Sequence, residues 1–268
     1  MTNAFRTLTF CLGLSLPQAA LAQSPRLSEI LDAQMRTGWK TEQGTHMAAL
    51  HLQLAPDWIT YWRHPGETGI VPQFDWSGSR NLAHARVHWP EPRLFIKSGF
   101  QSIGYADELV LPIELTPVTP GQPIELDATM LLGVCDDICI PVDLDLNATM
   151  HGAGQQDRAI AAALSSRPGT AKAAGLRAVS CEIAPHQRGL QLSAALDMPQ
   201  NGANEFALVE MTGAQGPGRS LGSERNGDAL MGHMLLPGTT TAIDRSAVRV
   251  SVVTEQGTVV HQGCALTD

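Results

Sequence analysis

Two cysteines separated by three residues are the most reactive feature of the sequence. Cys135 and Cys139 flank the tripeptide Asp136-Asp137-Ile138. Two thiols this close in sequence can form a disulfide, exchange that disulfide with another protein, or bind a soft metal ion. Each of these chemistries requires the two sulfur atoms to come within reach of each other or of one ion.

A disulfide between these cysteines requires a turn. In one straight strand their Cα atoms would lie about 13 Å apart, at roughly 3.3 Å per residue, whereas a disulfide needs about 4.4 to 6.8 Å. The three residues between them have the length of a hairpin loop. Facing residues on antiparallel strands lie about 4.5 to 5.5 Å apart at Cα. We therefore predict that Cys135 and Cys139 face each other across a hairpin.

Both sides of this loop have the period-two pattern of β-strands. Apolar residues occupy alternate positions from Ile124 to Val134 and again from Ile140 to Met150. The two cysteines fall in the opposite, polar phase of each run. We therefore predict a hairpin that displays the cysteine pair on its solvent side, away from the main core.

The loop between the cysteines is acidic. Carboxylates beside a thiol disfavour the thiolate by like-charge repulsion. We therefore expect Asp136 and Asp137 to favour the disulfide over the dithiol. A pair with this preference readily gives its electrons to another protein.

The first 22 residues have the pattern of a secretory signal peptide. Arg6 supplies a positive charge, residues 7–16 are mostly apolar, and Ala20-Leu21-Ala22 fits a cleavage site. We predict cleavage near Ala22 and an exported protein. No later apolar run is long enough to span a bilayer, so we expect no stable membrane insertion after cleavage.

Four of the five cysteines lie beyond this signal peptide. An even number in an exported chain suggests two disulfides, with three possible pairings. The spacing favours Cys135–Cys139 and Cys181–Cys264. By lowering the chain entropy of the unfolded state, a disulfide should stabilise the fold by about 2 kcal/mol when it closes the short loop and by about 4 to 5 kcal/mol when it closes the long one. We predict that Cys181–Cys264 is structural and that the short loop, which stabilises little, serves chemistry.

The composition describes a globular protein with two domains. The chain has 268 residues, 43% of them hydrophobic, and a net charge of -8. This acidic balance argues against a nucleic-acid partner, because no basic field is present to displace phosphate counterions. After residue 105 the only aromatic residue is Phe206, and such a shift suggests separate cores.

Short strands with regular turns predict an all-β fold. We expect two immunoglobulin-like antiparallel β-sandwich domains, at residues 23–150 and 176–268. The linker, residues 151–175, should be partly helical over Asp157–Ser165. In the second domain the pattern predicts strands at Gly189–Leu196, Glu205–Met211, Ala229–Leu236, Ala247–Val253 and Thr258–His261.

Several segments within residues 38–150 together resemble the N-terminal periplasmic domain of the DsbD thiol:disulfide interchange family, and more closely its ScsB-type (suppressor of copper sensitivity) members. Besides the cysteine motif, they are Trp58-Ile59-Thr60-Tyr61-Trp62-Arg63, Phe74-Asp75-Trp76-Ser77-Gly78, Ser102-Ile103-Gly104-Tyr105 and Leu109-Val110-Leu111-Pro112. The resemblance implies an immunoglobulin-like, periplasmic domain. The cysteine pair of that family accepts electrons from a thioredoxin-like domain and passes them to oxidised periplasmic proteins.

The resemblance also implies roles for single residues. Cys135 and Cys139 match the redox cysteines, and Phe95, in the expected loop Pro92 to Gly99, matches an aromatic cap that shields them. Arg93-Leu94 stands where DsbD has an acidic pair, and the two cysteines are closer together than in DsbD.

The partners are expected to be separate proteins, because the transmembrane and thioredoxin-like parts of the family are missing from this sequence. One partner would be a thioredoxin-like periplasmic protein or a membrane electron-transfer protein, and the others oxidised client proteins. No cofactor is expected.

Three functions stay open. The leading interpretation is a component of a periplasmic thiol-disulfide oxidoreductase system, which would act as a protein-disulfide reductase. The second is a copper module, because thiolates suit the soft Cu(I) ion; otherwise we predict no metal site. The third is a non-catalytic sandwich adaptor in which both disulfides are structural.

Overall fold

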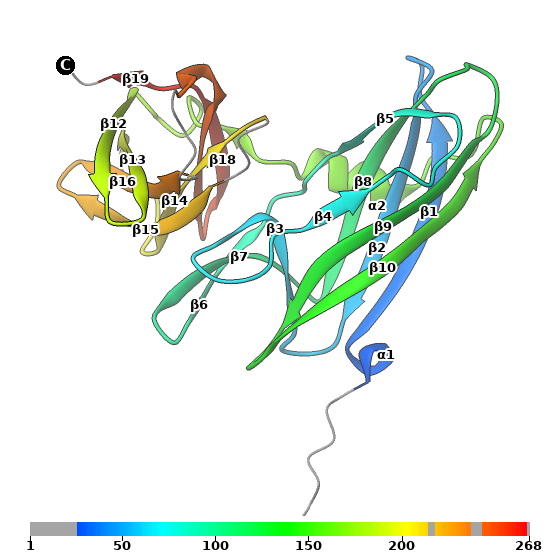
Figure 1. The fold of residues 1–268 in the computed structure, drawn as a ribbon, viewed down its shortest axis with the longest axis horizontal. Coiled ribbons are helices and arrows are strands. Elements are labelled where there is room, and N and C mark those ends of the chain that lie inside the picture. Colours follow the sequence, from blue (N-terminus) through cyan, green and yellow to red (C-terminus); the bar gives the residue numbers. More distant parts are fainter. Residues whose placement is uncertain (1–25, 214–217, 237–242, 267–268) are drawn as a thin grey trace, which may run out of the picture.

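The computed structural model describes residues 26–213, 218–236 and 243–266 of the chain. Strands dominate it and form four sheets, two in each half of the chain (Figure 1). The predicted signal peptide lies outside the described residues, so cleavage near Ala22 stays a prediction. Among the described residues, no helix is long and apolar enough to cross a membrane.

The first sandwich packs a four-stranded sheet against a six-stranded sheet. The short helix α1 (Leu27–Ile30) leads into it. The smaller sheet has the order β1 (Leu31–Lys40), β2 (His46–Leu54), β8 (Glu108–Pro117), β5 (Leu82–Val87). The larger sheet has the order β10 (Cys139–Met150), β9 (Ile124–Cys135), β3 (Ile59–Gly66), β7 (Phe100–Ala106), β6 (Arg93–Lys97), and β4 (Gln73–Asp75) also pairs with β9.

The alternating pattern of the sequence places the core of this sandwich. The apolar phase of β2 and β8 is buried between the sheets, where it meets the fully buried Trp62. In β10 every residue of the polar phase that follows Cys139 is exposed, and the apolar phase is buried or half-buried. Period-two patterning therefore predicted the inward faces of these strands correctly.

The linker between the sandwiches contains a helix that packs on the first of them. Helix α2 (Arg158–Ser165) begins one residue after the predicted start, because the Asp157 side chain caps it by accepting from the backbone N–H groups of Ala159 and Ile160. Ile160 is fully buried against Met47 of β2, on the outer face of that sheet. The predicted helix is confirmed, and it covers a second apolar face of β2.

The second sandwich has one sheet of four strands and one of five. The first has the order β11 (Gly169–Thr170), β18 (Gly257–Gln262), β17 (Val248–Thr254), β14 (Glu205–Met211). The second has the order β15 (Arg219–Asn226), β16 (Ala229–Leu236), β13 (Gly189–Asp197), β12 (Ala178–His186), β19 (Ala265–Leu266), and the short 3₁₀ helix η1 (Arg245–Ala247) precedes β17. The all-β fold of two sandwiches is confirmed. The predicted strand boundaries are correct for β14 and β16, whereas β12 and the mostly polar β15 were not predicted.

The two sandwiches share an apolar seam, so the prediction of separate cores is wrong at this place. Ala207 and Val209 of β14 face the second core, but Phe206 and Leu208, together with Val253, join the first. The reason is that β14 is buried on both faces, and its second face packs against the first sandwich. A strand that is buried on both faces reads as a continuous run of mostly apolar residues, and such a run does not show that its two faces belong to different cores.

Candidate functional site

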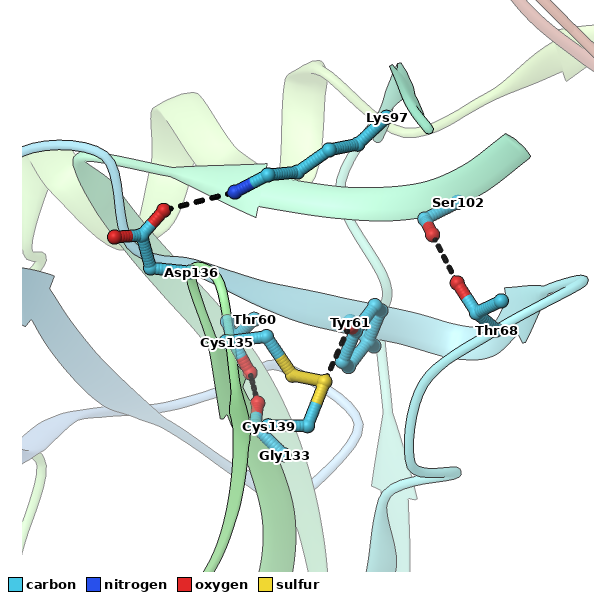
Figure 2. Close-up of a disulfide and its surroundings, with 9 residues drawn as sticks. All are labelled: Thr60, Tyr61, Thr68, Lys97, Ser102, Gly133, Cys135, Asp136 and Cys139. Carbon is cyan, nitrogen blue, oxygen red and sulfur yellow. Dashed lines mark hydrogen bonds and ion pairs between the residues drawn. A yellow bond between two sulfur atoms is a disulfide. The ribbon is translucent and has the colours of Figure 1, made fainter. Parts of the chain in front are cut away.

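The cysteine pair lies at the tip of the β9–β10 hairpin. Cys135 is the last residue of β9 and Cys139 the first of β10, and they face each other in register. Their sulfur atoms form a disulfide, with Cα atoms 4.1 Å apart (Figure 2). Inside the loop, the backbone N–H of Asp136 donates to the Ile138 carbonyl at 3.1 Å. The hairpin predicted from the spacing is confirmed.

The two cysteines differ sharply in exposure. Cys135 is only 2% exposed, whereas Cys139 is exposed. The difference follows from the strand order, since β9 lies between β10 and β3 and places Cys135 opposite Ile59, while β10 is the edge strand. The prediction that both cysteines lie on the solvent side is therefore wrong for Cys135. Within the pair, Cys139 is therefore the cysteine that lies at the surface.

Tyr61 of β3 points its hydroxyl at the exposed cysteine, with the oxygen 3.4 Å from the Cys139 Sγ (Figure 2). Its ring packs closely against two glycines, since an added Cβ would come within 2.5 Å of the ring at Gly69 and 3.1 Å at Gly133. Burial raises the pKa of Tyr61, against a smaller opposing effect of Lys97. The hydroxyl therefore keeps its proton and can donate to sulfur. This contact could not be predicted from local patterns, because 78 positions separate the two residues.

Strand β3 is held against the cysteine hairpin by a buried hydroxyl. Thr60 is 1% exposed, and its Oγ1 donates to the Gly133 carbonyl at 2.8 Å, two residues before Cys135. This bond fixes the strand that carries Tyr61 relative to the disulfide.

Lys97 of β6 changes the electrostatics expected for the acidic loop. Its Nζ lies 3.0 Å from Asp136 and 2.9 Å from Asp137, and the hydrogen bonds that Lys97 donates to the Asp137 and Asp136 carboxylates raise its pKa. The predicted repulsion between the loop carboxylates and a thiolate is therefore partly neutralised by a cation from a different strand. The same contact joins the β6–β7 hairpin to the cysteine loop.

Residues 28–150 match the family described as thiol:disulfide interchange protein DsbD, N-terminal. This part of the chain belongs to the DsbD N-terminal domain family. Residues 28–150 therefore form a thiol-disulfide interchange module, and this module contains the Cys135–Cys139 pair.

A solved structure extends the likeness to both sandwiches. The crystal structure of the N-terminal periplasmic domain of ScsB from Proteus mirabilis has the same fold, with a TM-score of 0.60 and 24% sequence identity. The match covers 95% of this chain and 97% of that one. No curated protein sequence matches the chain.

Phe95, the candidate cap of this DsbD N-terminal domain, lies in a strand and not in the predicted loop. It pairs with Ser102 as part of the β6–β7 hairpin. The hairpin closes through Ser98 and Gly99, whose φ angles of 53° and 81° form a tight turn. Phe95 is half-buried and, two residues before Lys97, projects from the same face of β6. Its role as a cap stays a prediction.

Apolar side chains are exposed on the two segments that Lys97 joins. Ile96 and Phe100 of the β6–β7 hairpin are 53% and 55% exposed, and Ile138 of the cysteine loop is 58% exposed. Phe100 is the register partner of Lys97 and shares its face of the hairpin, whereas Ile96 projects from the opposite face. We call these three residues the apolar rim of the DsbD N-terminal domain.

The second disulfide lies in the second sandwich, with the predicted partners. Cys181 of β12, which is 2% exposed, bonds to Cys264, and their Cα atoms lie 5.8 Å apart. The bond ties β12 to the segment before β19, which pairs with it. Across the described part of the chain, no group of three or more His, Cys, Asp or Glu side chains is arranged to hold a metal ion.

Proposed function

We propose that the protein is a periplasmic thiol-disulfide interchange protein that passes electrons through Cys135 and Cys139. The single observation that carries this proposal is the asymmetric disulfide, which joins one exposed cysteine at a hairpin tip to one buried cysteine. Disulfide exchange needs an accessible sulfur to attack and a leaving group, and this pair offers both. Membership of the DsbD N-terminal family supports the same chemistry.

In the first half of the cycle the protein accepts two electrons. A thiolate of a reduced thioredoxin-like donor attacks the Cys139 sulfur, and the Cys135–Cys139 bond breaks. The Cys135 sulfur leaves as a thiolate and takes up a proton. The second thiol of the donor then attacks the mixed disulfide, which leaves the donor oxidised and Cys139 reduced.

In the second half the dithiol reduces a client. The Cys139 thiolate attacks a disulfide of an oxidised periplasmic protein, and Cys135 resolves the mixed disulfide. The client gains two electrons and two protons, and the Cys135–Cys139 bond forms again. The hydroxyl of Tyr61 stabilises the attacking thiolate by donating a hydrogen bond to it. The apolar rim provides the contact surface for both partners.

Selective reduction tests this function. Incubation of the oxidised protein with a reduced thioredoxin-like protein should release two thiols at Cys135 and Cys139, while Cys181–Cys264 stays intact. Alkylation followed by peptide mass spectrometry identifies the thiols. Reduction of Cys135–Cys139 only after unfolding would instead support a structural staple. Stoichiometric retention of Cu(I) by the dithiol, without exchange, would support the copper module.

Replacing Tyr61 with phenylalanine should slow the chemistry while the fold is kept. The change removes the hydroxyl beside Cys139, and hydrogen bonds to a charged group contribute about 1.5 kcal/mol or more. We expect the thiolate fraction of Cys139 at neutral pH to fall by about tenfold. The rate of alkylation against pH measures this fraction, in a Cys135→Ser background so that only Cys139 reacts.

Tyr105→Phe is the matched control for this experiment. Its buried hydroxyl donates to the Pro90 carbonyl at 2.9 Å and does not contact sulfur. The control should leave the alkylation profile unchanged. Equal profiles for the two phenylalanine variants would show that Tyr61 has no effect on the thiolate.

Replacing Lys97 with methionine should slow exchange by about two- to fivefold, as expected for an exposed ion pair. The change leaves the carboxylates of Asp136 and Asp137 uncompensated beside the disulfide, so the approach and formation of a thiolate become less favourable. The rate of exchange with a reduced thioredoxin-like protein measures the effect at low salt, and high salt should weaken it.

Two further variants test whether the effect of Lys97→Met is electrostatic and local to the cysteine loop. Adding Asp136→Asn and Asp137→Asn to the Lys97→Met protein should restore the rate. Lys172→Met changes the net charge equally in an exposed turn outside the first sandwich and should have no effect. Failure of the asparagine substitutions to restore exchange would contradict the electrostatic explanation.

A further inference from the structure

Four arginines line one cleft at the seam between the two sandwiches. They are Arg63 of β3, Arg86 of β5, Arg167 of the linker and Arg249 of β17, and the cleft is open to solvent with a volume of about 550 Å³. The two sandwiches and the linker thus all contribute a guanidinium group to one space. This is unexpected in a chain with a net charge of -8.

The positive charge of this arginine cleft is only partly compensated. Among the described residues that line it, none is acidic. Arg63 pairs with Glu210 at 2.8 Å, but in the described part of the chain Arg86, Arg167 and Arg249 have no carboxylate partner within 4.0 Å. Guanidinium groups repel one another at close range, so a cluster of this kind is stabilised when an anion enters it.

Two of the guanidinium groups are held in place by neighbouring side chains. Arg63 stacks on the Trp62 ring, 3.5 Å from its centroid, and also donates to Ser251 at 2.8 Å. Arg167 donates from Nε to the Leu164 carbonyl at 2.9 Å, and its Nη1 lies 3.3 Å from His88 Nδ1. Groups fixed before binding lose less conformational freedom when a ligand arrives.

The pKa of His88 reflects the positive charges of the neighbouring arginines. Burial lowers the pKa of His88, and Arg167 and Arg86 lower it further, against the opposing effect of Glu114. Since Arg167 can only donate, Nδ1 of the neutral ring accepts from it and Nε2 donates to Glu114 at 3.0 Å. His88 therefore adds no positive charge but orients Arg167.

We propose that the arginine cleft binds a small soluble anion that carries at least two negative charges on phosphate or carboxylate groups. Planar guanidinium groups bind such oxygens in pairs, and the volume fits a small molecule. The bound anion bridges the two sandwiches and strengthens their seam. This site is separate from the thiol chemistry and does not depend on it.

Calorimetric titration of the oxidised, mature chain tests the site, with pyrophosphate as one probe and citrate as the other. At constant ionic strength we expect at least one of them to bind at one site per chain. The two probes distinguish a phosphate-binding site from a carboxylate-binding site. Arg86→Gln and Arg249→Gln should each weaken this binding by at least about tenfold, because each removes a charge-assisted pair of hydrogen bonds.

Arg188→Gln is the matched control, since Arg188 lies in the exposed turn before β13 and the change alters the net charge equally. It should leave the affinity unchanged. Tryptophan fluorescence checks that each variant is folded. Because Arg86 is exposed, the Arg86→Gln protein is expected to keep the native spectrum. The proposal is overturned if neither probe binds more than sodium chloride does at the same ionic strength. It is also overturned if Arg188→Gln weakens binding as much as Arg86→Gln.

Discussion

Replacing Cys139 with serine is expected to abolish disulfide exchange, whereas replacing Cys135 should trap the partner protein. Cys139 is exposed and Cys135 is 2% exposed, so attack by a large partner is possible at only one of the two sulfurs. In the Cys135→Ser protein, the remaining thiol forms a mixed disulfide that no neighbouring thiol resolves. In the Cys139→Ser protein, the remaining thiol is covered and reacts slowly.

Thiol trapping in the periplasm measures this difference. A tagged Cys135→Ser protein should migrate as a covalent complex on a non-reducing gel, and the complex should disappear after reduction. The Cys139→Ser protein should give almost none, and exchange in vitro should fall to the uncatalysed background. The Cys135→Ser/Cys139→Ser double variant is the control for other cysteines. Stronger trapping through Cys135 than through Cys139 would reverse the proposed roles of the two sulfurs.

The loss of the Cys181–Cys264 disulfide should lower the free energy of unfolding far more than the loss of Cys135–Cys139. The sequence separations are 83 and 4, and the entropy of loop closure predicts about 4.5 kcal/mol for the first and about 2 kcal/mol for the second. Because Cys181 and Cys135 are both 2% exposed, their burial contributes similarly and leaves the loop length as the main difference. The comparison uses the Cys181→Ala/Cys264→Ala and Cys135→Ala/Cys139→Ala proteins.

Two spectroscopic signals show which of the two sandwiches loses stability. All five tryptophans of the chain lie in the first half, so their fluorescence reports on the first sandwich, and circular dichroism reports on both. Urea denaturation of the Cys181→Ala/Cys264→Ala protein should shift the circular dichroism transition more than the fluorescence transition. Equal destabilisation by the two pairs of substitutions would contradict a structural role specific to Cys181–Cys264.

The cysteine hairpin shows how far local sequence determines this protein. Its register follows from three loop residues and from two alternating runs that adjoin them, so all the information lies within Ile124–Met150. The same holds for helix α2, whose cap and apolar positions are neighbours in sequence. Period-two alternation likewise predicted the all-β fold, because the side chains of a strand alternate between its two faces whatever the strand pairs with.

Only the tertiary structure decided which sulfur is exposed and what surrounds it. The alternation placed both cysteines in one phase, but the pairing of β9 with β3 covers Cys135 and leaves Cys139 on an edge strand. Tyr61 and Lys97 reach the site from distant parts of the chain, and the arginine cleft combines residues of both sandwiches. Such long-range contacts depend on the order of strands in a sheet and on the packing of one sandwich against the other. Neither leaves a periodic trace in the sequence, whereas the hairpin and the helix do.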